Sequence, residues 1–303
     1  MTAAIAAMAG RLAALLALSF AAAVAITRRQ KIFAKQPKAA TPAKIAAPTA
    51  KTEGGALAAP WMKPLKGALQ HGGTQRHKRD RSDAKRKQVQ LATVDPATMR
   101  PSVRTIVFRG FMPRGLMAAA DCGKPNEESC ALMFITDSRA DKVRHISSGG
   151  SFVECCWWLD EAGAQFRISG TAVLATANSE DSTLRAACET VWERLTTSTK
   201  QTFFWPSPGA PASQDAVTKR AKARSEEEEE CAASSEAELS LAKANFVLLI
   251  VLPDRVDELR LGGKQRRNLY TLEREIGEAP AQGGAAQLAR WSKTRWAQVA
   301  TNP

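Results

Sequence analysis

The sequence predicts a mainly β fold with peripheral helices, of the α+β class, built as one barrel-like domain. Five segments of 6 to 11 residues, rich in Val, Ile, Phe, Trp or Thr and preceded by a shorter one, are separated by turn residues. Two helical segments interrupt these strands, and no internal repeat is present. The 303 residues are 44% hydrophobic and 24% charged, which excludes collagen, coiled coil and wholesale disorder.

The folded body is expected to span residues 59–303 and to begin with a short amphipathic helix. Trp61, Leu65 and Leu69 repeat at the spacing of such a helix. The predicted strands are residues 90–94, 103–111, 131–136, 152–159, 165–175 and 246–252. Their order, with helix and loop before the last strand, favours one barrel-like domain over separate domains.

Two further helices are expected between the strands. A short one follows Ser138, and a longer one spans residues 179–197 with Ser179 or Ser182 as its N-cap. The apolar positions of the longer helix recur as a core-facing stripe. They are Leu184, Ala187, Cys188, Val191, Trp192 and Leu195.

The net charge of +13 lies outside most of the folded body. Residues 1–58 and 59–103 each carry +7, whereas residues 104–303 carry −1. A nucleic-acid-binding protein needs basic side chains gathered on a folded face with aromatic residues among them. We therefore expect no nucleic-acid partner.

The N-terminal segment has the composition of a targeting sequence. Residues 12–26 are uncharged and rich in alanine, and this stretch is shorter than the about 20 residues that a membrane-spanning helix needs. Residues 27–58 are rich in Lys, Ala, Thr and Pro, with Glu53 as the only acid. We expect residues 1–58 to be an organelle presequence, of the plastid type, or a disordered basic linker, with membrane contact only here. The alternative is a membrane anchor at residues 12–26.

An acidic segment interrupts the body before the last predicted strand. Residues 209–243 include the run RSEEEEECAASSEAE, in which like charges repel and little apolar surface is available for burial. We expect a disordered surface insertion, and the alternative is a regulatory acidic loop.

The cysteines and histidines form no recognisable metal or catalytic pattern. Six cysteines show no CxxC spacing, and only three histidines are present to serve as ligands or bases. We expect no metal site and no imidazole-based nucleophilic centre. The expected positions of Cys155, Cys156 and Cys188 are in the core, and that of His145 is on a helix surface.

Three strings carry residues suited to a phosphorylated cofactor: RPSVRTIVFRGF, FITDSRADK and QFRISG. Arg104 lies within a β-branched strand, where a buried charge needs a partner. That partner is either a carboxylate, Asp137 or Asp141, or a phosphate on which Arg104, Arg139 and Lys142 converge.

The same strings also offer hydrogen-bonding groups for a planar ring. Gln165 provides both a donor and an acceptor, as does the backbone of residues 105–107, and such groups read the edge of a heterocycle. A phosphate site beside such an edge indicates a nucleotide-like cofactor.

These strings, together with PWMKPLKGAL, QLATV and FVLLIVLPDRVDELRL, resemble the FMN-binding split-barrel family of pyridoxamine 5'-phosphate oxidase, and most of all its oxidase-like flavin domains. The resemblance covers about residues 59–303 and implies a split β-barrel, FMN as cofactor, and a homodimer with FMN at the interface. The positions that it implies for cofactor binding are Arg104, Thr105, Ile106, Val107, Arg109, Ile135, Thr136, Arg139, Lys142, Gln165 and Arg267.

The chain departs from the oxidase pattern at four positions near this implied site. Arg109 stands where the oxidase has a lysine, Ala140 where it has a serine, Asp141 where it has an arginine, and Leu259 where it has a tryptophan. FMN binding survives these changes, although Asp141 is expected to weaken the hold on phosphate.

The oxidase's substrate residues are also replaced. Val191 and Leu195 stand near its helical Tyr and Arg, and no histidine follows His145. The resemblance thus implies an FMN-binding oxidoreductase with an unassigned substrate and no assigned catalytic residue, and it argues against pyridoxamine phosphate. The alternative is a non-catalytic flavin- or haem-binding module of the same fold.

Overall fold

The computed structural model describes six stretches of the chain, all within the compact unit Pro48–Pro303: residues 50–55, 59–70, 84–117, 127–211, 236–273 and 295–302. Its strands are β1 (Ala50–Gly55), β2 (Gln88–Val94), β3 (Pro101–Pro113), β4 (Glu128–Asp137), β5 (Phe152–Leu159), β6 (Ala164–Ala175), β7 (Phe246–Arg260), β8 (Arg266–Glu273) and β9 (Arg295–Thr301). Its longer helices are α2 (Met62–Gln70), α5 (Ser182–Glu193) and α8 (Glu236–Asn245). The shorter ones are α4 (Asp141–Ser147), α6 (Thr197–Gln201), η2 (Arg114–Leu116), η3 (Asp160–Ala162) and η4 (Thr202–Phe204).

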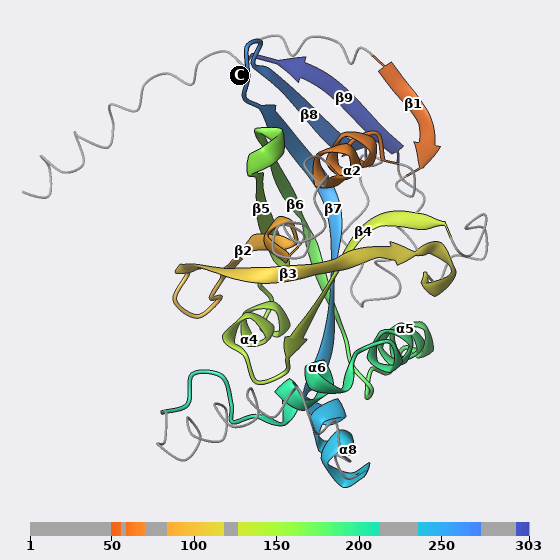
Figure 1. Cartoon of the computed structure of the whole chain (residues 1–303), viewed down its shortest axis with the longest axis vertical. Coiled ribbons are helices and arrows are strands. Elements are labelled where there is room, and N and C mark those ends of the chain that lie inside the picture. The colour runs from red at the N-terminus through yellow and green to blue at the C-terminus, as the bar shows by residue number, and fades with distance from the viewer. Residues whose placement is uncertain are drawn as a thin grey trace, which may run out of the picture. The chain divides into compact units, whose positions relative to one another are not determined.

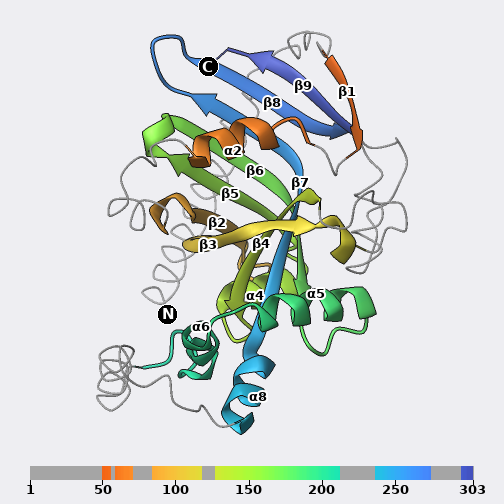
Figure 2. The same ribbon diagram turned by 45° about the vertical axis from the view of Figure 1, so that its right-hand side comes forward.

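Six antiparallel strands close into a barrel in the order β7, β4, β3, β2, β5, β6 and back to β7. The strands β8, β9 and β1 continue the sheet outward from β7 (Figure 1). Figures 1 and 2 both show α2 toward one end of the barrel and α4 with α6 toward the other. The mainly β split-barrel fold expected from the sequence is confirmed.

The strand β7 is shared between the barrel and its extension. Its first part pairs with β4 up to Val251, and its last part pairs with β8 from Arg255 onward, while β6 pairs along most of its length. Pro253 lies in the gap between the two pairings, where its missing N–H is tolerated. The register shift in β6 brings Gly170 so close that an added Cβ would lie 2.2 Å from the Leu252 carbonyl oxygen. Only glycine allows this approach.

The barrel interior is filled largely by aromatic and branched side chains. Phe108 contacts both Phe134 and Trp157, with ring centroids 6.1 and 4.8 Å apart. Outside it, Trp61 at the start of α2 packs edge-on against Trp296 of β9, with centroids 6.0 Å apart. The motif that predicted a short helix therefore places its tryptophan under the extended sheet.

The structure keeps the predicted ends of β5, lengthens the other predicted strands, and adds three that the sequence did not predict, β1, β8 and β9. The helix predicted over residues 179–197 is shorter, because Asp181 accepts hydrogen bonds from the backbone N–H groups of Thr183 and Leu184 and so becomes its N-cap. Ser179, expected as a cap, instead accepts from the N–H of Thr176.

Two predicted loop regions contain regular structure at their ends. The helix α8 occupies residues 236–243 of the expected insertion, and the remainder from residue 212 to 235 lies outside the described residues. The strand β1 lies inside the expected presequence and pairs with β9, so the fold begins before residue 59. Residues 1–49, with the predicted targeting segment and possible anchor, lie outside the described residues. Among the helices that are described, none combines the length and apolarity needed to cross a membrane.

Candidate functional site

The strands β2, β3 and β4 and the helix α4 place several polar side chains at one end of the barrel. Arg104 is paired in register with the buried Leu91, and it shares the inner face of β3 with Ile106 and Phe108. Ile106 and Phe108 are core residues, whereas Arg104 lies one step nearer the barrel end and is half-buried. The face predicted for these three side chains from strand alternation is therefore observed.

The guanidinium of Arg104 is held by neutral acceptors. Its Nη1 donates to Thr93 Oγ1 at 2.7 Å and to the Leu91 carbonyl at 3.1 Å, and its Nη2 donates to Ser102 Oγ at 2.7 Å. Burial lowers the pKa of Arg104, and the Asp141 carboxylate acts weakly in the opposite direction. Neither carboxylate considered as its partner contacts it, and within the described residues Arg104 forms no ion pair. The positive charge is thus available to an anion.

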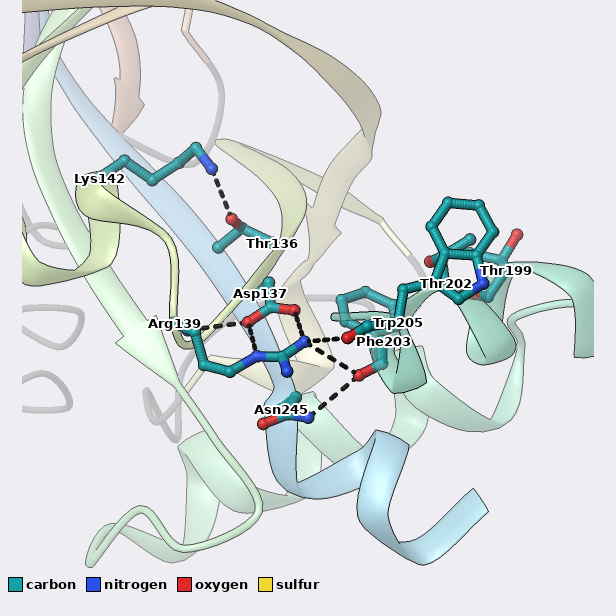
Figure 3. A network of polar contacts seen from close by, with 9 residues as sticks. All are labelled: Thr136, Asp137, Arg139, Lys142, Thr199, Thr202, Phe203, Trp205 and Asn245. Carbon is teal, nitrogen blue, oxygen red and sulfur yellow. Dashed lines mark hydrogen bonds and ion pairs between the residues drawn. The ribbon is translucent and has the colours of Figure 1, made fainter. Parts of the chain in front are cut away.

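Lys142, in the first turn of α4, lies close enough to Arg104 for the two charges to repel. Its Nζ donates to Thr136 Oγ1 at 2.9 Å (Figure 3). Burial lowers the pKa of Lys142, and the charge of Arg104 lowers it further, against the raising effect of Asp137 and Asp141. Two half-buried cations that disfavour each other's charge form an arrangement that a phosphate dianion would stabilise.

Arg139 does not join this pair, although the sequence analysis placed it there. Its Nε and Nη2 donate to the two carboxylate oxygens of Asp137 at 2.9 and 2.6 Å, and Nη2 also donates to the Trp205 carbonyl at 2.9 Å (Figure 3). Asn245 Nδ2 donates to the neighbouring Phe203 carbonyl at 3.0 Å. Arg139 and Asn245 therefore hold the segment Phe203–Trp205, at the end of η4, against the end of β4.

This held segment forms one wall of a pocket of about 470 Å³ on the outer side of β4. Arg109 is the cation at its exposed rim, and burial of part of its surface lowers the pKa of Arg109. In the described part of the chain, the Arg109 side chain has neither a hydrogen bond nor an ion pair. The pocket is lined by Arg109, Ile135, Thr136, Asp137, Ser198, Thr199, Thr202, Phe203, Trp205, Pro206 and Pro208.

Among the strands that the structure describes, the backbone of residues 101–107 has a neighbour on one side only. This stretch of β3 pairs with β2, but the pairing of β3 with β4 begins at Phe108 and Phe134. Backbone groups near Thr105 that point toward β4 are thus free of a ladder partner and can bond a heterocycle edge. The Ile106 side chain is buried in the core, and its backbone groups point toward β2, as do those of Phe108, whose N–H donates to the Lys87 carbonyl.

Gln165 and Arg267 lie on the opposite, outer face of the sheet from Arg104. They are aligned across β6, β7 and β8 through Leu259, which pairs in register with both. Arg267 donates to Asp257 at 3.0 and 2.8 Å, and Arg167 also pairs with this buried carboxylate. Within one chain, the residues implied by the resemblance therefore form two groups that do not meet.

The sequence analysis missed the polar residues that surround Arg104, and it was wrong about His145. Instead of lying on a helix surface, His145 is 4% exposed, and its Nδ1 lies 3.0 Å from the hydroxyl of the buried Thr93. The interpretation of Cys155 and Cys188 as core residues is confirmed, while Cys156 is only half-buried. Thr93 and Ser102 lie beside Arg104 on the paired strands β2 and β3. The sequence could have indicated this contact only if the register between the two strands had been known.

Comparisons with known proteins show which sequences and structures this chain is similar to. Residues 58–176 match the family model described as pyridoxamine 5'-phosphate oxidase, FMN-binding domain. Pyridoxine/pyridoxamine 5'-phosphate oxidase 2 of Arabidopsis thaliana is 27% identical over 224 residues, which are 74% of this chain and 94% of that protein.

Solved structures show the same likeness. A pyridoxamine 5'-phosphate oxidase-related, FMN-binding protein of Nostoc punctiforme is 28% identical with a TM-score of 0.56, over 81% of this chain and 99% of its own. PhzG of Burkholderia lata, solved with tetrahydrophenazine-1-carboxylic acid, is 17% identical with a TM-score of 0.50, over 81% and 94% of the two chains. The second likeness is one of fold.

Proposed function

We propose that this chain is an FMN-dependent oxidoreductase acting on a small anionic molecule, because residues 58–176 match the family model of the pyridoxamine 5'-phosphate oxidase FMN-binding domain. The observation that carries the proposal is the pair of half-buried cations, Arg104 and Lys142, at the barrel end. The pocket beside Arg109 supplies the rest of the argument.

The residues at the barrel end fit the phosphate of FMN. Arg104 and Lys142 supply two positive charges, and the Thr136 hydroxyl beside Lys142 supplies a further hydrogen-bonding group. An approaching phosphate dianion would replace the mutual repulsion of the cations by attraction to both. Arg139 supports this site from the side, through the ion pair that fixes Asp137.

The flavin ring is assigned to the free edge of β3. The backbone groups of Thr105 and Val107 point away from β2 and can hydrogen-bond the polar edge of the ring, since no strand among the described residues covers that side. The bound FMN would supply reversible two-electron transfer, whereas the chain's own residues bind the cofactor, orient it and stabilise negative charge on it. The roles assigned to Gln165 and Arg267 require a second chain, because both lie on the outer face.

A second copy of the chain is proposed to cover that outer face. Large apolar side chains lie exposed on β3 and β5, the two strands that flank β2, with Phe152 66%, Val103 63% and Trp158 41% accessible. An apolar sheet face of this kind marks an interaction surface. A Phe152→Glu variant is expected to shift the protein from dimer to monomer in light scattering after gel filtration and to weaken FMN binding. A monomeric wild type, or a variant that stays dimeric, would contradict the assignment.

The pocket at Arg109 is proposed to receive the substrate. The side chains of Arg109, Ser198, Thr199 and Thr202 combine a cation with three hydroxyls, which suits a carboxylate or phosphate group. Pyridoxamine 5'-phosphate appears in the name of the Arabidopsis relative, but it is not the substrate that we expect for this chain. Both Val191 and Leu195 pack against the hydrophobic core and offer it no polar contact.

Spectroscopy of the purified full chain tests the function. The protein is expected to take up FMN, and its oxidised flavin absorbance should bleach with an anionic organic donor under nitrogen and return with air over repeated cycles. Pyridoxamine 5'-phosphate should bleach it slowly or not at all. A bound flavin that stays oxidised with every carboxylate and phosphate donor would instead indicate a binding module. An axial histidine for the haem alternative is not on offer, because both ring nitrogens of His145, the one histidine among the described residues, are engaged.

Plastid targeting is proposed for the residues that precede the fold. Since β1 belongs to the sheet, the proposed presequence is reduced to residues 1–47. Fusion of these residues to a fluorescent protein is expected to direct it to plastids in plant cells. Retention in the cytosol or on other membranes would refute the proposal.

A further inference from the structure

His145 is a buried titratable side chain at the barrel end that the proposed site does not use. It lies on α4, three residues after Lys142, and points into the barrel rather than to solvent. Its Nδ1 is 3.0 Å from Thr93 Oγ1, and its Nε2 is 3.2 Å from Nη2 of Arg144. A buried imidazole that contacts two polar groups needs a defined tautomer.

The neighbours of the ring determine where its proton lies. The guanidinium of Arg144 can only donate, so Nε2 must accept and carry the lone pair. The neutral ring therefore carries its hydrogen on Nδ1 and donates it to the Thr93 hydroxyl. Arg144 is itself held by Asp95 at 3.5 Å and by Asp141 at 3.4 Å.

The Thr93 hydroxyl then accepts two hydrogen bonds, one from His145 and one from Arg104 Nη1 at 2.7 Å. Both lone pairs of the oxygen are used, and Thr93 is only 1% exposed, so no water competes for them. The threonine oxygen is thus fixed, and with it the Nη1 end of the Arg104 fork. The Nη2 end is fixed by Ser102.

We propose that His145 is a positioning residue for the cofactor phosphate, acting through Thr93 to orient the guanidinium of Arg104. This inference rests on the proposed role of Arg104 in FMN binding and extends it to a residue that never touches the cofactor. This relay, in which His145 Nδ1–H and Arg104 Nη1–H both donate to Thr93 Oγ1, links α4, β2 and β3 at the barrel end. A charged side chain held in one orientation loses less conformational freedom when the phosphate arrives.

A purely structural role for His145 would have a different signature. If the ring only anchored α4 to the barrel, its loss would disturb the whole end of the barrel and weaken every flavin equally. Loss of the relay instead weakens only a flavin that carries a phosphate. Comparing FMN with riboflavin, which lacks the phosphate, therefore separates the two roles.

The experiment measures dissociation constants of FMN and riboflavin for the full-length protein by quenching of flavin fluorescence. The variant His145→Leu is expected to raise the dissociation constant for FMN about fivefold, as for loss of one hydrogen bond, and that for riboflavin less than twofold. His145→Asn keeps an N–H at the place of Nδ1–H and should restore FMN binding to within twofold of wild type. Ile146→Val, on the same helix, is the packing control and should leave the FMN to riboflavin ratio unchanged.

A second pair of variants tests the relay at Thr93, so that the test does not depend on correct folding of the histidine variants. Thr93→Val should reproduce the selective loss, whereas Thr93→Ser retains the hydroxyl and should not. In an Arg104→Met background, His145→Leu should have no further effect on FMN.

Each possible failure has its own meaning. A wild type that binds no FMN would refute the proposed function itself. An Arg104→Met variant with an unchanged ratio of the FMN and riboflavin dissociation constants would refute the role of Arg104. If Arg104→Met changes that ratio while His145→Leu and Thr93→Val leave it unchanged, or weaken both flavins equally, the positioning role of His145 is overturned.

Discussion

Lys142 should weaken the stability of the protein without cofactor and strengthen its hold on FMN. The variant Lys142→Met keeps most of the aliphatic stem and removes the ammonium group. A hydrogen bond to a charged group contributes about 1.5–3 kcal/mol. Since about 1.4 kcal/mol corresponds to a factor of ten in Kd, the FMN dissociation constant should rise about 10- to 100-fold. Riboflavin, which lacks the phosphate, should be bound as before.

The same variant should raise the stability of the protein without FMN. Burial and the charge of Arg104 lower the pKa of Lys142 in the folded state, so folding disfavours its charged form at neutral pH. Methionine carries no charge and removes both this desolvation cost and the repulsion of Arg104. The expected result is a higher Tm for the variant than for wild type when neither contains flavin.

Thermal unfolding and flavin titration at neutral pH measure the two effects on one preparation. Lys85→Met, at an exposed position away from the site, is the control with the same change in net charge. The reasoning is refuted if Lys142→Met lowers the affinity for riboflavin as much as that for FMN, or if it lowers the Tm of the flavin-free protein.

Three further predictions concern pH, the barrel seam and a helix cap. A bound phosphate raises the lowered pKa of Lys142, so FMN binding should take up protons at alkaline pH. The dissociation constant of FMN should therefore increase with pH in that range, while that of riboflavin should not. Titrations with each flavin at a series of pH values measure the difference. Gly170→Ala places a Cβ 2.2 Å from the Leu252 carbonyl oxygen, so it should lower the free energy of unfolding by about 1–3 kcal/mol. The Tm measured by circular dichroism should fall by about 3–10 °C, and an unchanged Tm would contradict the close approach of β6 to β7. Asp181→Ala removes the N-cap of α5 and should cost about 1 kcal/mol in denaturant unfolding, whereas Asp181→Asn should retain most of that stability.

Local sequence pattern was sufficient for the elements that form the barrel wall. The strand β5 was predicted with its observed ends, because alternating side chains there are buried and exposed in turn. The last barrel strand was predicted to stop at residue 252, since Pro253 and charged residues follow. The structure continues β7 to Arg260, because Pro253 lies where the strand changes partner from β4 to β8. The strands β8 and β9 were missed, since few of their side chains are buried.

The chemistry of the site divides in the same way. From residues alone, Arg104 and Lys142 could be named as cations that need an anion, and the order of short motifs indicated an FMN-binding split barrel. Three further features depend on strand register and on how α4 is placed against the barrel. They are whether the three cations meet, whether the histidine is buried, and which hydroxyls surround Arg104. Arg139 pairs with Asp137, only two residues away, but it also bonds the Trp205 carbonyl, which the fold brings beside it. His145 turned inward to Thr93 because the placement of α4 against the barrel decides which side chains meet, and no local pattern contains that distance information.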